Sequence, residues 1–215
     1  MTTPGGPALS KYQAENDLLY LLEAFHSLGL ERVHQTQINA LLYLAAAAGR
    51  LYNIGFGYLF RPDSFGPSSQ EVNQAITANL LRKTVSATPT GEPDEGTLLF
   101  SITDKGKATV KNLLLLAREE SRRKHISFIV QALKVYGPRV AAKFATIEPS
   151  FAAAISRNAH AVIDLDGNEN RLVEGVEQLA GQLLEQGVLL SVPEAKFVCF
   201  FDALSNGFGP SLTIG

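Results

Sequence analysis

Apolar residues recur at helical spacing in two segments near the start of the chain. Between residues 14 and 28 the leucines and Phe25 lie three or four positions apart, and Gly29 stands where a helix C-cap is expected. A second stripe begins after Thr36, whose hydroxyl can cap the first free amides, and it ends in an alanine run and Gly49. The pattern predicts two helices, each with one face in a core.

Aromatic residues and glycines dominate the next stretch, between residues 51 and 65. Tyr58 and Phe60 flank Leu59 as in a short strand, and residues 61–64 have the composition of a turn. The stretch predicts an extended connector or an edge strand.

A third helix is predicted directly after this stretch. A Gly-Pro pair precedes Ser68 and Ser69, and either serine can cap a helix whose apolar positions continue to Leu81. Glu71 in the first turn suits the helix dipole. The polar face of this helix would carry Gln70, Asn73, Gln74, Thr77 and Lys83.

Two short strands are predicted on either side of a loop at residues 90–96, because apolar residues alternate there with polar ones. After them Thr103 or Asp104 can cap a fourth helix. We expect this helix either to continue to Tyr136 or to break within the charged stretch 118–124. Helices followed by a strand pair, the wing, and then by a further helix have the order of a winged-helix domain, a class that usually binds DNA or another protein.

The pattern changes in the last third of the chain. Two short helices divided by residues 148–150 are expected, then a short strand at 162–165 and an amphipathic helix at 172–184. The apolar runs 188–192 and 196–201 indicate further strands. The predicted fold class is therefore mainly α with a small β-hairpin wing, followed by a small α+β C-terminal subdomain. The expected divisions are a flexible tail at 1–10, a winged-helix-like helical domain at 11–136 and the C-terminal subdomain at 137–215.

Composition places the chain among ordinary globular proteins. With 215 residues, of which 46% are hydrophobic and 19% charged, it can bury a full core. The one cysteine, Cys199, cannot form an internal disulfide, and its Phe-Val-Cys-Phe-Phe setting indicates a small buried apolar residue. The first residues lack the basic and apolar regions of a signal peptide, and no apolar run reaches the roughly 18 residues that span a bilayer. We expect a soluble, cytoplasmic protein without a membrane partner.

Motifs for catalysis, metal or cofactor binding are weak. Residues 164–170 alternate Asp and Asn as in a calcium loop, but an arginine stands where that loop needs glycine, so a polar turn that caps the next helix is the better interpretation. The four histidines lack zinc spacing, and the chain has neither a nucleophile elbow nor a phosphate loop. Two acidic pairs, Glu15 with Asp17 and Glu119 with Glu120, fit a helix surface. We expect a non-enzymatic protein without cofactor or metal; the remaining alternative is an enzyme whose residues are widely scattered.

Charge argues slightly more for a protein partner than for DNA. The net charge is −2 and the pI about 6.1, and three carboxylates in the wing loop would repel a phosphate backbone. Two basic clusters and the polar face of the third helix keep a DNA-binding transcriptional regulator as the alternative. On that alternative, bases would be read by Gln70, Asn73, Gln74 and Thr77, and phosphates would be held by Arg82, Lys83, Arg122, Arg123 and Lys124.

Three motifs resemble those of a known family. They are INALLYL at residues 38–44, SFGPSSQEV at 64–72 and FSITDKGK at 100–107. Within about residues 36 to 116, the chain resembles the winged-helix-like family that includes YwgA-type proteins and the Panacea antitoxin domain. The resemblance implies a regulatory or neutralising role in bacteria or their mobile elements, with a partner such as the product of a neighbouring gene.

The C-terminal end is rich in aromatic residues. Phe197, Phe200, Phe201 and Phe208 suit either a core or an interface between copies of the chain. A homo-oligomer is therefore a further expectation that the sequence leaves open.

Overall fold

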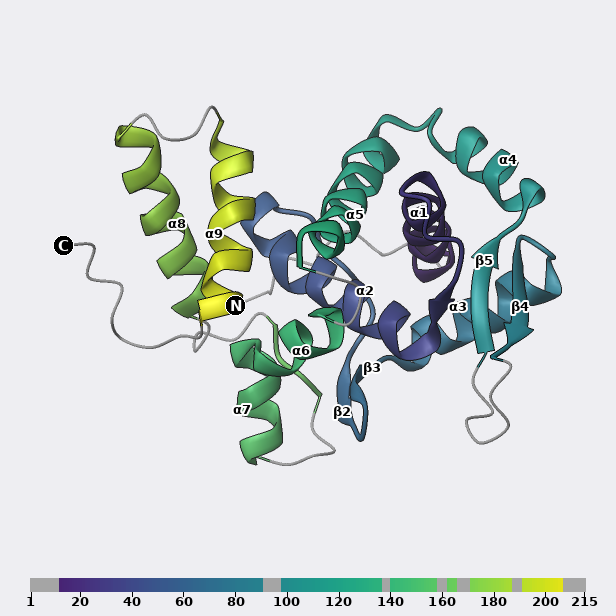
Figure 1. Ribbon diagram of the computed structural model, residues 1–215, viewed down its shortest axis with the longest axis horizontal. Coiled ribbons are helices and arrows are strands. Elements are labelled where there is room, and N and C mark those ends of the chain that lie inside the picture. Colours follow the sequence, from purple (N-terminus) through teal and green to yellow (C-terminus); the bar gives the residue numbers. More distant parts are fainter. Residues whose placement is uncertain are drawn as a thin grey trace, which may run out of the picture.

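The computed structural model describes residues 12–90, 98–136, 140–157, 162–165, 171–186 and 191–206. Within them the protein is mainly helical, with a three-stranded and a two-stranded antiparallel sheet (Figure 1). This confirms the predicted class at the level of a mainly α protein with small sheets. The elements are α1 (Gln13–Ser27), β1 (Val33–His34), α2 (Gln35–Gly49), the 3-10 helix η1 (Arg50–Tyr52), β2 (Arg61–Asp63), β3 (Gly66–Ser68), α3 (Gln70–Leu81), β4 (Val85–Pro89), β5 (Leu98–Ile102), α4 (Asp104–Leu113), α5 (Ala117–Tyr136), α6 (Val140–Ile147), α7 (Pro149–Arg157), α8 (Arg171–Glu185) and α9 (Val192–Asn206).

The first three helices form where the apolar stripes predict them. Gly29, just beyond α1, has a φ of +74°, the left-handed conformation that suits glycine at a helix end. Ser69 caps α3, and its Oγ accepts from a backbone N–H of the first turn at 3.4 Å. The predicted cap of α2 is wrong, because Thr36 lies inside the helix. The N-cap residue of α2 is instead His34, whose backbone N–H donates to Gln37 Oε1 at 3.3 Å.

The three-stranded sheet has the strand order β1-β5-β4. β4 and β5 pair antiparallel with Ala87 opposite Phe100, which confirms the two strands predicted on either side of the loop at residues 90–96. No sequence pattern predicts β1, because two residues are too few to show alternation. Val33 of β1 also lies opposite Phe100 and brings the start of α2 to the sheet. Residues 91–97 of the predicted wing loop lie outside the described residues.

A separate hairpin of β2 and β3 precedes α3. The turn predicted at residues 61–64 is misplaced, because Asp63 pairs with Gly66 and the turn consists of Ser64 and Phe65. Gly66 has a φ of +121°, a backbone conformation that would be strained in any residue with a side chain. The turn is predicted too early because Pro62, which lies in β2, is a residue typical of turns, although a proline is also tolerated in a short edge strand.

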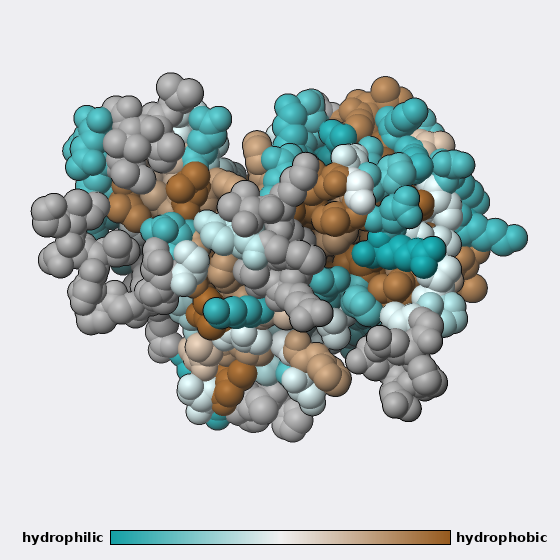
Figure 2. All heavy atoms as spheres, in the orientation of Figure 1, coloured by the Kyte–Doolittle hydropathy of each residue, from teal (hydrophilic) through white to brown (hydrophobic). Residues whose placement is uncertain are grey.

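The helical segment after β5 breaks earlier than predicted. α4 ends at Leu113 and α5 begins at Ala117, so the break precedes the charged stretch 118–124. Leu115 and Leu116 are 84% and 49% exposed in this break. Figure 2 shows an apolar surface in brown at the upper right, in the region where Figure 1 draws α4 and α5.

Two of the strands predicted in the C-terminal part, 162–165 and 196–201, are wrong, whereas residues 188–190 of the one predicted at 188–192 lie outside the described residues. Residues 196–201 belong to α9, where Phe197 and Phe201 recur at helical spacing, and α9 packs mainly against α8. Residues 162–165 form no strand, although the Ile163 N–H donates to the carbonyl of Phe60 at 2.8 Å. The regular structure described after Tyr136 is therefore helical, which corrects the predicted α+β subdomain.

Contacts connect these later helices to the earlier ones. α6 packs on α2 and β3, and α7 packs on β2. At this junction the Tyr43 hydroxyl of α2 donates to the Glu148 carboxylate, which is fully buried. The same Glu148 oxygen accepts from the backbone N–H groups of Ser150 and Phe151 at 2.8 and 3.1 Å, and so caps α7. The boundary expected near residue 137 stays a prediction, and the two sides of it share this buried contact.

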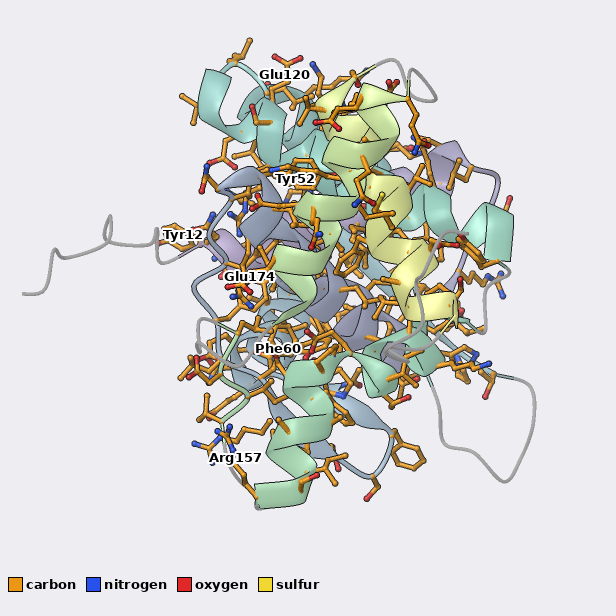
Figure 3. All side chains as sticks on the ribbon, turned by 90° about the vertical axis from the view of Figure 1, so that its left-hand side faces the viewer. Tyr12, Tyr52, Phe60, Glu120, Arg157 and Glu174 are labelled. Atoms are coloured by element: carbon orange, nitrogen blue, oxygen red, sulfur yellow. The ribbon has the colours of Figure 1, made fainter. Side chains whose placement is uncertain are left out.

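Aromatic residues fill much of the interior. Phe60 lies among the packed elements in Figure 3. Its ring meets that of Tyr43 edge-on, and the two ring centroids are 5.2 Å apart. Phe200 and Phe201 are also buried, so these two side chains belong to the core, whereas Phe208 lies outside the described residues. Cys199 is buried, as predicted. Among the described helices, none is long and apolar enough to cross a membrane.

His125 of α5 is a buried titratable group in this core. Its Nε2 lies 2.8 Å from the carbonyl of Ala45, and the rings of Tyr52 and Phe56 lie 5.3 and 5.9 Å away. Burial opposes the charged form and lowers the pKa of His125 to about 4. The neutral imidazole therefore donates to Ala45.

We expect His125 to make the protein less stable in mild acid. Because the unfolded chain takes up the proton near pH 6.5, the stabilisation is complete above that pH and is lost as the pH falls toward 4. Between pH 7 and 5 the group should remove about 2 kcal/mol from the free energy of unfolding. Urea unfolding of His125→Gln should show that much less pH dependence. The exposed His26→Gln should keep the wild-type profile, and equal profiles for all three proteins would contradict the assignment.

Candidate binding groove beside α3

A groove lies between the β2–β3 hairpin and helix α3, next to the start of α2. Figure 1 shows where these elements lie. It consists of two adjoining pockets of about 310 and 480 Å³, which we call together the hairpin groove. Asp63, Ser68 and Asn73 line both pockets. The first pocket extends to the start of α2 and β5, and the second extends along α3.

The polar residues predicted on the third helix gather along this groove. Gln70, Asn73, Gln74 and Thr77 all line the second pocket, because they lie on one face of α3 at helical spacing. Arg61 of β2 lines the same pocket. The sequence did not indicate Arg61, since the turn predicted there gives no reason to place it opposite α3.

A chain of side-chain amides joins α2 to α3 at the wall between the pockets. The backbone N–H of Ser69 donates to Asn39 Oδ1 at 2.9 Å. Asn39 Nδ2 donates to Asn73 Oδ1 at 3.1 Å, and Gln35 Nε2 donates to the same oxygen at 3.0 Å. Asn39 is 4% exposed, so this polar residue within an apolar helix stripe is explained by its role in the chain of hydrogen bonds.

The first pocket also has an exposed apolar wall. Phe65, in the turn of the hairpin, is 76% exposed, and Leu98 at the start of β5 is 42% exposed. An exposed aromatic side chain beside polar groups is typical of protein interfaces. Sequence reasoning missed Phe65 because its place in a hairpin turn follows only from the register of β2 and β3.

Four of the predicted phosphate contacts lie at the surface, and three of these are already paired. Arg82 forms an ion pair with Glu15, and Lys83 is exposed with a φ of +58°. Arg123 pairs with Glu23 at 2.8 Å, and Lys124 pairs with Glu120 at 2.7 Å. Exposed pairs of this kind are weak, so they lower but do not abolish the capacity of these cations to meet an anion.

Arg122, the fifth, does not lie at the surface. Its side chain is 7% exposed and forms two hydrogen bonds to Asp17, Nε to Oδ1 at 2.5 Å and Nη2 to Oδ2 at 2.6 Å. It also donates to the carbonyl of Gly55 at 2.5 Å and lies over the ring of Phe56, 4.0 Å from the centroid. A phosphate contact by Arg122 is therefore excluded, and the prediction is corrected.

Asp17 and Glu119 also differ from their prediction as surface acids. Asp17 is fully buried in α1. Its carboxylate accepts the two hydrogen bonds from Arg122 and a third from the hydroxyl of Tyr58, at 3.3 Å. Glu119 is 7% exposed and accepts from the hydroxyl of Tyr20 at 2.9 Å. These residues form a buried ionic cluster between α1 and α5. Helical spacing alone did not reveal it, because each acid sits among residues that are common on helix surfaces.

No known protein family and no curated protein matches the chain in sequence. The resemblance to the YwgA-type and Panacea winged-helix-like family thus stays a prediction.

Within the part of the chain that the structure describes, no three His, Cys, Asp or Glu residues are grouped so that they could hold a metal ion. Residues 166–170 of the rejected calcium-loop pattern lie outside that part.

Proposed function

We propose that this protein is a non-enzymatic regulatory protein of winged-helix type that acts by binding a protein partner at the hairpin groove, as an antitoxin-like protein or an adaptor would. The observation that carries the proposal is the composition of the groove. It combines uncharged polar residues of α3 with the exposed side chains of Phe65 and Leu98. Aromatic anchors beside satisfied polar groups characterise protein recognition sites.

The order of the elements supports the winged-helix type. α1, β1, α2 and α3 precede the paired strands β4 and β5, and β1 pairs with β5 to give the order β1-β5-β4. In a winged helix the helix before the wing faces the partner, and α3 has that place in the chain. The further helices α5 to α9 would then be additions around this unit.

Electrostatics favours a protein over DNA. Of the described residues that line the groove, one is an arginine and one an aspartate, Arg61 and Asp63, and their charges are opposite. A surface that tracks a phosphate backbone needs several unpaired cations, since counterion release supplies most of that affinity. The near-neutral groove fits a polypeptide better.

A DNA-binding regulator is the second candidate, because one observation favours it. Gln70, Gln74 and Thr77 share the exposed face of α3 with Arg61 at one end and Lys83 beyond the other. This is the side-chain set that reads bases and holds phosphates in winged-helix regulators.

Phe65 should be required for partner capture. We expect Phe65→Ser to reduce by at least about tenfold the amount of a specific protein that is crosslinked to the tagged protein in its own cells, because an interface anchor is worth about 2 kcal/mol or more. The matched control is Leu81→Ser, since Leu81 is 80% exposed at the end of α3 but lines neither pocket. Equal recovery by both variants, measured by quantitative mass spectrometry, would refute the assignment of the groove.

A further inference from the structure

The orientation of the Asn73 amide is set by a backbone donor. The Ser69 N–H can only donate, so the Asn39 atom that it contacts is the acceptor Oδ1. The other Asn39 atom is then the amino group, which donates to Asn73 Oδ1, and Gln35 Nε2 donates to that same oxygen. A carbonyl oxygen has two lone pairs, and both are used here by the protein itself.

The amino group of Asn73 remains. Among the residues that the structure describes, none accepts a hydrogen bond from Asn73 Nδ2, while Asn73 lines both pockets of the hairpin groove. We infer that Asn73 Nδ2 is a fixed hydrogen-bond donor of the groove, and that its ligand is an extended peptide segment of the partner that places a main-chain carbonyl there. This inference rests on the proposed function and adds the chemistry of the ligand.

The same bonding argues against base reading by Asn73. Asparagine recognises adenine by donating to N7 and accepting from the N6 amino group. The second half of that contact needs a free acceptor on Asn73, and Oδ1 already receives two donors. A peptide carbonyl needs only the donor, so it matches Asn73 as the protein holds it.

The apolar wall of the first pocket specifies the neighbouring side chain of the peptide. Successive side chains of an extended segment point to opposite sides, so one of them can pack on Phe65 and Leu98 while the main chain meets Asn73. Arg61 and Asp63 offset each other, so the groove does not demand a charged ligand. The expected ligand is a neutral extended peptide with an apolar residue next to the bound carbonyl.

The test uses a phage-displayed library of random peptides, selected on the full-length protein. We expect enriched peptides that share an apolar residue, and we measure their affinity as synthetic labelled peptides. Asn73→Asp keeps the oxygen that accepts hydrogen bonds from Gln35 and Asn39, but it replaces the amino donor by an acceptor. We expect this variant to bind the peptides about tenfold more weakly, or weaker still. Gln131→Glu makes the same chemical change at an exposed position of α5 and should leave affinity unchanged. Thermal unfolding of both variants shows that they are folded.

The outcomes separate this inference from the proposed function. Peptides that bind Asn73→Asp as tightly as the wild type overturn the donor role, and if the same peptides are lost with Phe65→Ser, the groove still binds protein. A library that yields no peptide also overturns the inference, as does selectivity for adenine in duplex DNA that depends on Asn73. The crosslinking experiment with Phe65→Ser then decides the proposed function by itself.

Discussion

Arg122→Met is expected to lower the free energy of unfolding by about 3 to 5 kcal/mol, the usual effect of removing one partner of a buried ion pair. Methionine fills similar space, but Asp17 would keep its buried charge without the two hydrogen bonds that now hold it. The carbonyl of Gly55 would lose a donor as well. Urea unfolding followed by circular dichroism measures this change.

The next residue of the same helix provides the control. Arg123 also forms an ion pair between α5 and α1, with Glu23, but its side chain is 34% exposed. Arg123→Met should therefore change stability by no more than about 1 kcal/mol. Asp17→Asn added to Arg122→Met should recover part of the loss, because it removes the uncompensated charge. A small effect of Arg122→Met, equal to that of Arg123→Met, would show that the interior does not depend on the pair.

Glu148→Ala is expected to cost about 3 kcal/mol, because it removes the acceptor of several buried donors at once. These donors are the Tyr43 hydroxyl and the backbone N–H groups of Ser150 and Phe151. The loss should appear as a lower midpoint of urea unfolding with one cooperative transition, since the contact joins α2 to the start of α7. Two separate transitions would instead indicate that the helices after Tyr136 unfold independently.

Tyr43→Phe separates the two roles of Glu148. It removes the hydroxyl alone and leaves Glu148 with both backbone donors, so we expect a smaller loss of about 1 kcal/mol. A loss as large as that of Glu148→Ala would show that the cap of α7 contributes little to stability.

Local signals in the sequence predict much of the fold near α3. The helix start at Ser69, the glycine after α1 and the strands β4 and β5 follow from capping and alternation within a few residues. The strand predicted at 196–201 fails for a physical reason. Residues 197–201 are all apolar, so no polar position among them reveals the period, and such a short run suits a buried strand and a buried helix equally.

The site could be predicted only in part. Gln70, Asn73, Gln74 and Thr77 share a helix face, and that arrangement follows from sequence spacing. Arg61 and Phe65 enter the groove through hairpin pairing that no periodicity indicates. Arg122 and Arg123 are adjacent and chemically alike in sequence, yet one is buried and the other is not. Their burial depends on whether Asp17 or Glu23 faces them from α1, which is a property of the packed fold.

Fluorescence anisotropy of labelled duplex DNA tests the central claim most directly, namely that the groove beside α3 recognises protein and not DNA. The purified protein is titrated into a duplex from upstream of its own gene and into a random duplex, each at low and at physiological salt. We predict equal, weak binding to both duplexes at low salt and none at physiological salt, because Arg82, Arg123 and Lys124 are paired with carboxylates. Tight, salt-sensitive binding that prefers the upstream duplex would contradict the account and identify a transcriptional regulator.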